Sequence, residues 1–116
     1  MQTDKQLAGA ECEQQALAYL KRQGLRLIQA NFSCKSGEID LIMQDGDELV
    51  FVEVRQRADL QHGGAAASIT PAKQRRIVRA AQFYLLRHQP VPPCRIDVVA
   101  IDGKHLNWIR NAIEAC

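Results

Sequence analysis

The sequence lacks the features that mark membrane-bound, secreted or zinc-binding chains. No apolar stretch approaches the roughly 20 residues that span a bilayer, and the first six residues lack the basic and apolar regions of a signal peptide. Cys12, Cys34, Cys94 and Cys116 are scattered, with no C-x-x-C pair, so no structural zinc site is expected. These absences predict a cytoplasmic protein with four free thiols and no membrane partner.

Aromatic residues are also scarce, at 5% of 116 residues, so the core must rest mainly on Leu, Ile, Val and Ala. The hydrophobic fraction of 47% and the charged fraction of 24% are ordinary for a globular chain and exclude disordered and fibrous classes. A chain of this length supports one hydrophobic core. We therefore expect a single domain over residues 1–116.

Acidic residues are missing from one long segment. Residues 60–96 hold six basic residues and no acidic one, whereas residues 1–59 hold seven basic and ten acidic residues. Such asymmetry suits a protein that binds a metal at one place and a polyanion beside it. A solvated helix face whose acidic partners lie elsewhere explains the same pattern. The six residues are Lys73, Arg75, Arg76, Arg79, Arg87 and Arg95.

Hydrophobic periodicity and turn residues predict two helices, five strands and a short C-terminal helix. The two longer helices are expected over 7–23 and 71–88, with Thr70 as N-cap and Pro71 in the first turn. A loop that contains His62 is expected over 58–68. The order α-β-β-β-α-β-β predicts an α/β fold, a central mixed sheet flanked by helices on both faces. The strands are expected over 25–31, 38–44, 49–55, 95–101 and 105–109.

The candidate catalytic residues lie on the expected hairpin of strands 38–44 and 49–55. A four-residue loop over 45–48 places Asp40 opposite Glu53, and a two-residue loop places Asp40 opposite Phe51 with Glu53 on the diagonal. Either register leaves the two carboxylates on one face, because side chains alternate along a strand. Opposed like charges destabilise a sheet, so a divalent cation or Arg55 must compensate them. Oxygen ligands favour Mg²⁺ or Mn²⁺; a purely structural Asp–Arg–Glu cluster is the alternative.

The same strings resemble a known family. GEIDLI at 37–42, followed by a turn and FVEVR at 51–55, is similar to the D…(D/E)-x-K core of restriction-endonuclease-like nucleases. The closer likeness is to the bacterial YraN family of endonuclease-like proteins, relatives of archaeal Holliday junction resolvases. It covers almost the whole chain, including residues 13–24, Lys73 and residues 95–99.

The resemblance implies a restriction-endonuclease-like fold and a metal-dependent endonuclease that hydrolyses phosphodiester bonds of DNA, branched DNA included. Asp40 and Glu53 would ligate Mg²⁺, or Mn²⁺, together with the backbone carbonyl of Val54. Glu13 would complete the metal or water shell, and Arg55 stands where the catalytic lysine of the family usually sits. Because the resolvases dimerise, the resemblance also implies a homodimer.

Arg55 departs from the family pattern. A guanidinium does not deprotonate and is larger than an ammonium, so arginine is a poor proton acceptor. A non-catalytic nucleic-acid-binding domain with a degenerate nuclease site is therefore the alternative function, and a small scaffold protein is a third. The expected contacts to nucleic acid come from the second helix. They are Lys73, Arg75, Arg76 and Arg79. Lys73 lies beside the apolar stripe, where it either points to the sheet and contacts phosphate or packs its aliphatic stem along the core. Arg75 and Arg79 form either a phosphate track or ordinary surface charge.

Three further residues have structural interpretations beside functional ones. Glu38 shares the face of Asp40, where it either joins the site or pairs with Arg55 or Arg57. Asp97 is a further candidate carboxylate, although we expect it to partner Arg95 or Arg55. Trp108 is expected in the core at a sheet edge rather than as a platform for stacking bases.

Overall fold

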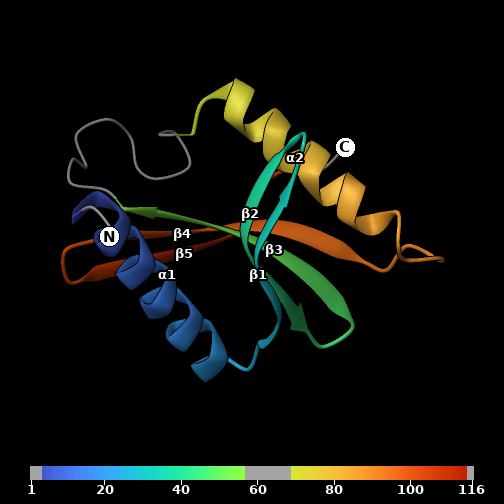
Figure 1. Ribbon diagram of the computed structural model, residues 1–116. Coiled ribbons are helices and arrows are strands. Elements are labelled where there is room, and N and C mark those ends of the chain that lie inside the picture. The colour runs from blue at the N-terminus through green and yellow to red at the C-terminus, as the bar shows by residue number, and fades with distance from the viewer. Residues whose placement is uncertain (1–3, 57–68, 115–116) are drawn as a thin grey trace.

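The computed structural model describes residues 4–56 and 69–114. Helices α1 (Asp4–Arg22) and α2 (Pro71–Leu85) flank one five-stranded sheet of order β1-β2-β3-β4-β5 (Figure 1). Only β3 and β4 pair in parallel, so the sheet is mixed. The predicted α/β fold and element order are confirmed. The strands are β1 (Arg26–Cys34), β2 (Gly37–Asp45), β3 (Glu48–Gln56), β4 (Cys94–Asp102) and β5 (His105–Ile113).

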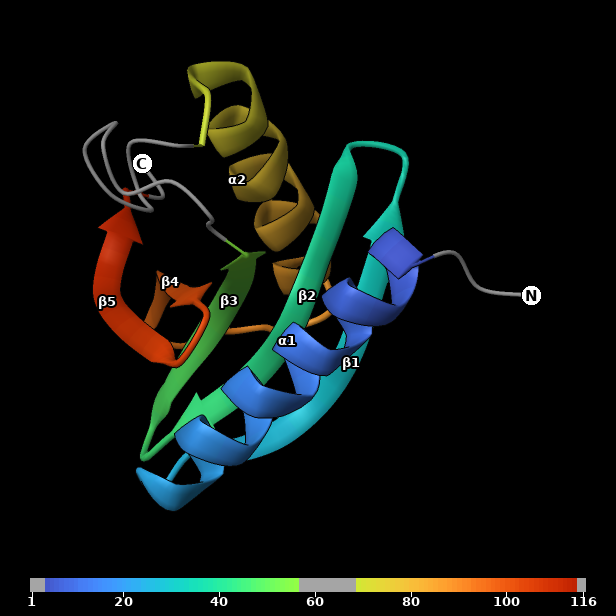
Figure 2. The same cartoon turned by 90° about the vertical axis from the view of Figure 1, so that its left-hand side faces the viewer.

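The two helices cover opposite faces of the sheet, and Figure 2 shows α1 lying across β1 and β2 with α2 beyond the sheet. The alternation along β3 explains this arrangement, since successive side chains enter different cores. Val50 and Val52 pack with Leu20 of α1, whereas Phe51 packs with Tyr84 of α2. All five are at most 5% exposed. Removal of apolar area from water on both faces holds the helices in place.

Helix α2 begins as the sequence predicts and ends earlier. The Thr70 hydroxyl accepts a hydrogen bond from the Lys73 N–H at 3.2 Å, and Pro71 occupies the first helical position. The helix ends at Leu85 rather than at the predicted His88. Leu86, next in the chain, is 70% exposed, so a further turn would bury little apolar surface.

The predicted C-terminal helix is wrong, because β5 continues to Ile113. Ile113 pairs with Ile96 of β4 and is buried in the core under α2. Between this pair and the pair Val98–Ile109, β5 bulges at Asn111. The φ of Asn111 is 52°, and its N–H donates to the carboxylate of Asp97. This side-chain contact carries the strand through a kink that local pattern does not reveal.

The predicted loop over 58–68 lies outside the described residues. Within the part of the chain that the structure covers, no helix combines the length and apolar character needed to cross a membrane.

Candidate functional site

The β2–β3 hairpin has the register that a four-residue loop predicts, with Gln44 paired to Leu49. The ladder stops one residue short of Asp40 and Glu53. At that point Oδ2 of Asp40 accepts a hydrogen bond from the N–H of Val54 at 2.8 Å. The Asp40 carboxylate thus accepts the Val54 N–H where the ladder between β2 and β3 ends. Asp40 and Glu53 therefore do not form a directly opposed cross-strand pair, which like charges would destabilise.

Glu53 is one of the two buried charged residues among those described, at 6% exposure. Its nearest cation is Lys73 from the first turn of α2, with Nζ 3.5 Å from Oε1. Burial, together with the charge of Asp40, raises the pKa of Glu53 from 4.5 to about 7, although Lys73 and Arg55 act in the opposite direction. The folded chain therefore holds a carboxyl group whose ionisation is only partly compensated.

Asp40 and Glu13 are a second pair of neighbouring carboxyl groups. Burial raises the pKa of Asp40, against the opposing hydrogen bonds from Val54 and Glu13. Burial also raises the pKa of Glu13, and so does the neighbouring charge of Asp40. The two carboxyl groups lie close enough to share a hydrogen bond when one of them is protonated. Helix α1 thus brings Glu13 beside Asp40, although Glu13 lines a separate pocket between α1 and β1 rather than the carboxylate cavity.

A cavity of about 390 Å³ opens beside these carboxylates. Its wall comes from the β1–β2 turn, from β2 and β3, and from the first two turns of α2. Glu38 lines it, as its strand parity predicts, and Arg76 and Lys73 give it positive charge. The complete lining is Ser33, Cys34, Gly37, Glu38, Asp40, Glu53, Lys73, Arg76 and Ile77.

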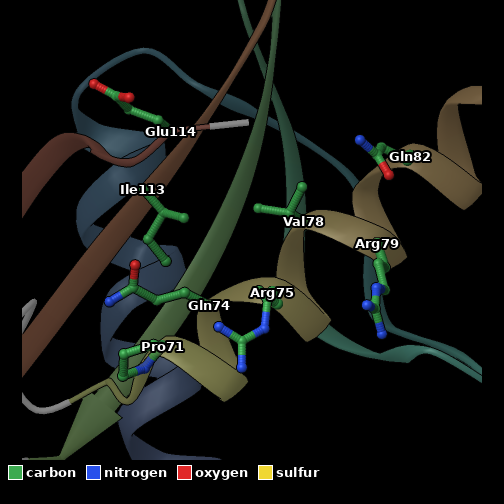
Figure 3. Close-up of a pocket in the computed structure, with 8 residues that line it drawn as sticks. All are labelled: Pro71, Gln74, Arg75, Val78, Arg79, Gln82, Ile113 and Glu114. Atoms are coloured by element: carbon green, nitrogen blue, oxygen red, sulfur yellow. The ribbon is translucent and has the colours of Figure 1, made fainter. Parts of the chain in front are cut away.

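The four basic residues expected to contact nucleic acid divide between two sides of α2. Lys73 and Arg76 line the carboxylate cavity, whereas Arg75 and Arg79 line a groove of about 360 Å³ between α2 and the end of β5. Figure 3 shows Arg75 and Arg79 one turn apart, with Val78 and Ile113 forming the apolar part of that groove. The groove contains none of the site carboxylates.

Arg55 does not line the cavity, although it follows Glu53 by two residues. It is half-buried, and its Nε is buried without a hydrogen-bond acceptor within residues 4–56 and 69–114. Its charge lowers the pKa of Glu53, but Lys73 is the cation that contacts this carboxylate. The motif position and the contacting cation are therefore different residues.

Gly37 has a packing role that the sequence did not reveal. A Cβ atom at this position would lie 3.0 Å from the backbone carbonyl oxygen of Arg76. The start of β2 therefore approaches α2 so closely that an added Cβ would force the Arg76 backbone to give by a few tenths of an ångström. Gly37 and Arg76 also line the same cavity. The only sequence signal was the place of Gly37 at the start of the GEIDLI string.

Asp97 belongs to a separate structural cluster. It is fully buried and accepts hydrogen bonds from Nε of Arg95, Nε1 of Trp108 and the N–H of Asn111, at 2.8 to 3.1 Å. It pairs with Val52, whose side chain faces the α1 core rather than the carboxylate cavity. The expectation of a structural partner for Arg95 is confirmed. Trp108 is half-buried in the same cluster, also as expected.

The oxygen donors suit a small hard cation that keeps part of its water shell. Among the described residues, no three His, Cys, Asp or Glu side chains converge as a metal-binding group. Asp40 and Glu53 do line one cavity, and the carbonyl of Val54 adjoins them in the chain. Mg²⁺ is commonly bound through one or two carboxylates with several waters retained. Two carboxylates whose pKa values are raised by burial fit that requirement, because a cation would offset their charge.

Comparison with known proteins adds the family. The sequence profile described as "Uncharacterised protein family UPF0102" matches residues 12–101. The chain belongs to the UPF0102 family. A UPF0102 protein of Herminiimonas arsenicoxydans is 59% identical over 113 residues, which cover 97% of this chain and 91% of the relative. For a UPF0102 protein of Janthinobacterium sp. (strain Marseille) the identity is 61%, with 97% and 92% covered. Every residue of the carboxylate cavity lies within the matched segment of this UPF0102 chain.

Proposed function

We propose that this UPF0102 chain is a metal-dependent endonuclease of the restriction-endonuclease-like superfamily that hydrolyses phosphodiester bonds of DNA in the cytoplasm. One observation carries the proposal: Asp40 and Glu53, on diverging strands of one hairpin, line a single cavity with Lys73. Carboxylates held together in this way need a cation, and a phosphodiester needs positive charge to approach them. The resemblance of the same strings to the YraN family supports this function.

The site residues have separable roles. The carboxylates of Asp40 and Glu53, with the carbonyl of Val54, would hold Mg²⁺ or Mn²⁺, which supplies a Lewis acid that neutralises charge developing on the phosphate. The N–H of Val54 fixes one oxygen of Asp40, and Glu13 of α1 contacts the Asp40 carboxyl group. These bonds restrict the rotation of Asp40 and so pre-organise the donor set.

Helix α2 supplies the electrostatic attraction for a polyanion. Its first turn contains no acidic residue, although the N-terminal end of a helix favours negative charge. Arg75, Arg76 and Arg79 are exposed, and no ion pair joins them to another part of the described chain. Basic residues without an ion pair contribute little to the stability of the fold. A phosphodiester backbone along α2 would offset their charge, and its phosphates would also interact favourably with the N-terminal end of the helix.

The proposal is tested by incubating the protein with labelled duplex, single-stranded, flap and four-way-junction DNA, with Mg²⁺, Mn²⁺ or EDTA. Asp40→Asn and Glu53→Gln are each expected to abolish metal-dependent cleavage. Asp47→Asn, the same substitution at an exposed turn residue of the same hairpin, is the matched control and should cut normally. Cleavage that persists in both site variants would contradict the proposal.

One observation favours the alternative of a non-catalytic nucleic-acid-binding domain. Arg55 stands at the motif's lysine position and does not line the cavity. This alternative predicts salt-dependent DNA binding without cleavage of any substrate. Symmetric cutting of a junction further requires two sites, so the nuclease proposal for branched DNA includes a homodimer, to be checked by sedimentation with and without junction DNA.

A further inference from the structure

The inference concerns which cation acts in the site, and it rests on the proposed nuclease function. The sequence motif points to Arg55, but the geometry points elsewhere. Nζ of Lys73 lies 3.5 Å from Oε1 of Glu53, and the Lys73 side chain lines the cavity that Asp40 also lines. Arg55 lines neither this cavity nor the groove on the other side of α2.

The fold holds the Lys73 backbone firmly. Its N–H is capped by the Thr70 hydroxyl at 3.2 Å, and the side-chain amide of Gln74 donates to the carbonyl of Ile69 at 2.9 Å. One turn further along, Ile77 is buried in the core at 3% exposure. Gly37 lies close to the Arg76 backbone and lines the same cavity as Lys73. The cap and the buried Ile77 thus fix where the helix places the Lys73 backbone.

The partial exposure of Lys73 allows it to meet a substrate. Its side chain is 38% exposed, whereas the Glu53 side chain that it contacts is 8% exposed. The ammonium is therefore the more accessible member of the pair, and both side chains line the cavity.

We propose that Lys73, and not Arg55, supplies the positive charge that acts on the scissile phosphate. In the reaction the oxygen of a water molecule forms a bond to phosphorus, and the bond from phosphorus to the leaving sugar oxygen breaks. The leaving oxygen keeps that electron pair and takes up a proton, while the attacking water releases one to solvent. The Lys73 ammonium donates a hydrogen bond to a non-bridging oxygen of the phosphate as negative charge grows on that oxygen.

This role differs measurably from simple phosphate anchoring. A group that binds substrate and transition state equally changes affinity, whereas a group that acts mainly in the transition state changes the rate at saturating substrate. Loss of one donor to a developing oxyanion lowers the rate by about 10²–10³-fold. Lys73→Met should therefore reduce the single-turnover rate by that factor with DNA affinity changed only a few-fold.

The matched control is Arg55→Met, which removes a cation of equal charge two residues from Glu53. We expect it to reduce the rate at saturating DNA far less than Lys73→Met. Rescue adds chemical specificity: ethylammonium should restore part of the activity of Lys73→Ala, and guanidinium should not. A rate loss confined to Arg55→Met, or a Lys73→Met defect confined to DNA affinity, would overturn the inference.

A second measurement needs no cleavage and separates this inference from the proposed function. At pH 8.5 and without DNA, the Lys73 ammonium beside Glu53 should repel an incoming Mn²⁺. The Arg55 guanidinium, which does not line the cavity, should repel it less. Lys73→Met should therefore bind Mn²⁺ several-fold more tightly than wild type, with Arg55→Met near wild type. If Arg55→Met instead bound Mn²⁺ more tightly than Lys73→Met, the placement of Lys73 would be refuted even if wild type cut no DNA. If the Mn²⁺ affinities follow the expected order but wild type cuts no DNA, only the nuclease activity is refuted.

Discussion

Replacement of Glu53 by glutamine is expected to stabilise the metal-free protein at alkaline pH. Burial and the charge of Asp40 raise the Glu53 pKa from 4.5 to about 7, against the opposing charges of Lys73 and Arg55. One pKa unit is worth ~1.4 kcal/mol, so ionised Glu53 costs the folded state about 3 kcal/mol relative to the unfolded chain. Because the folded pKa is raised, the associated stability is fully present below pH 4.5 and is lost as pH rises through 7.

Glutamine does not titrate, so the two proteins should diverge over that pH window. The free energy of unfolding of Glu53→Gln minus that of wild type should rise by about 3 kcal/mol between pH 4.5 and pH 8.5. Urea unfolding in EDTA measures both proteins at each pH. The comparison across pH cancels any packing loss from the substitution itself, because that loss is present at both ends.

Glu11→Gln, which changes an exposed carboxylate on α1, is the matched control and should give a level difference across the same range. Addition of Mg²⁺ at pH 8.5 should stabilise wild type and leave Glu53→Gln unchanged, since only the folded wild-type site binds the cation. A level difference for Glu53→Gln would refute the reasoning that the folded protein desolvates this carboxylate and places it beside Asp40.

Gly37→Ala should destabilise the fold by about 1–3 kcal/mol and slow cleavage, because the new methyl group would press on the α2 backbone; urea unfolding and single-turnover rates measure both. Asp97→Ala should cost about 3–5 kcal/mol by uncoupling the buried bonds to Arg95 and β5, while the Mn²⁺ affinity in calorimetry stays unchanged. Arg75→Gln combined with Arg79→Gln should weaken DNA binding and reduce the salt slope of log K by about 2, with the rate at saturating DNA retained. A weaker Mn²⁺ affinity for Asp97→Ala, or an unaltered salt slope, would contradict these assignments.

Much of the fold was predictable from local pattern. The continuous apolar run Val50-Phe51-Val52 agrees with the predicted sheet covered on both faces, and Thr70 with Pro71 marks the start of α2 as predicted. The end of β5 was not predictable in this way. Its bulge depends on a bond between the Asn111 N–H and the Asp97 side chain, 14 residues away, and no local periodicity encodes such a contact.

Local pattern likewise predicts part of the site, but not all of its contacts. Period-two alternation brings Asp40 and Glu53 to one face in either register, and both line one cavity. The contact between Glu53 and Lys73 was not predictable, because it depends on the angle at which α2 packs on the sheet. Lys73 lies on α2 and Glu53 on β3, so tertiary packing rather than local pattern decides which cation meets the carboxylate.

A crystal soaked in Mn²⁺ at pH 8.5 would show whether Asp40 and Glu53 form a divalent-cation site. We expect one anomalous peak bound by both carboxylates and the carbonyl of Val54, and no such peak in crystals of Asp40→Asn. A wild-type crystal with no peak at this position in millimolar Mn²⁺, or with a peak that persists in the variant, would contradict this expectation.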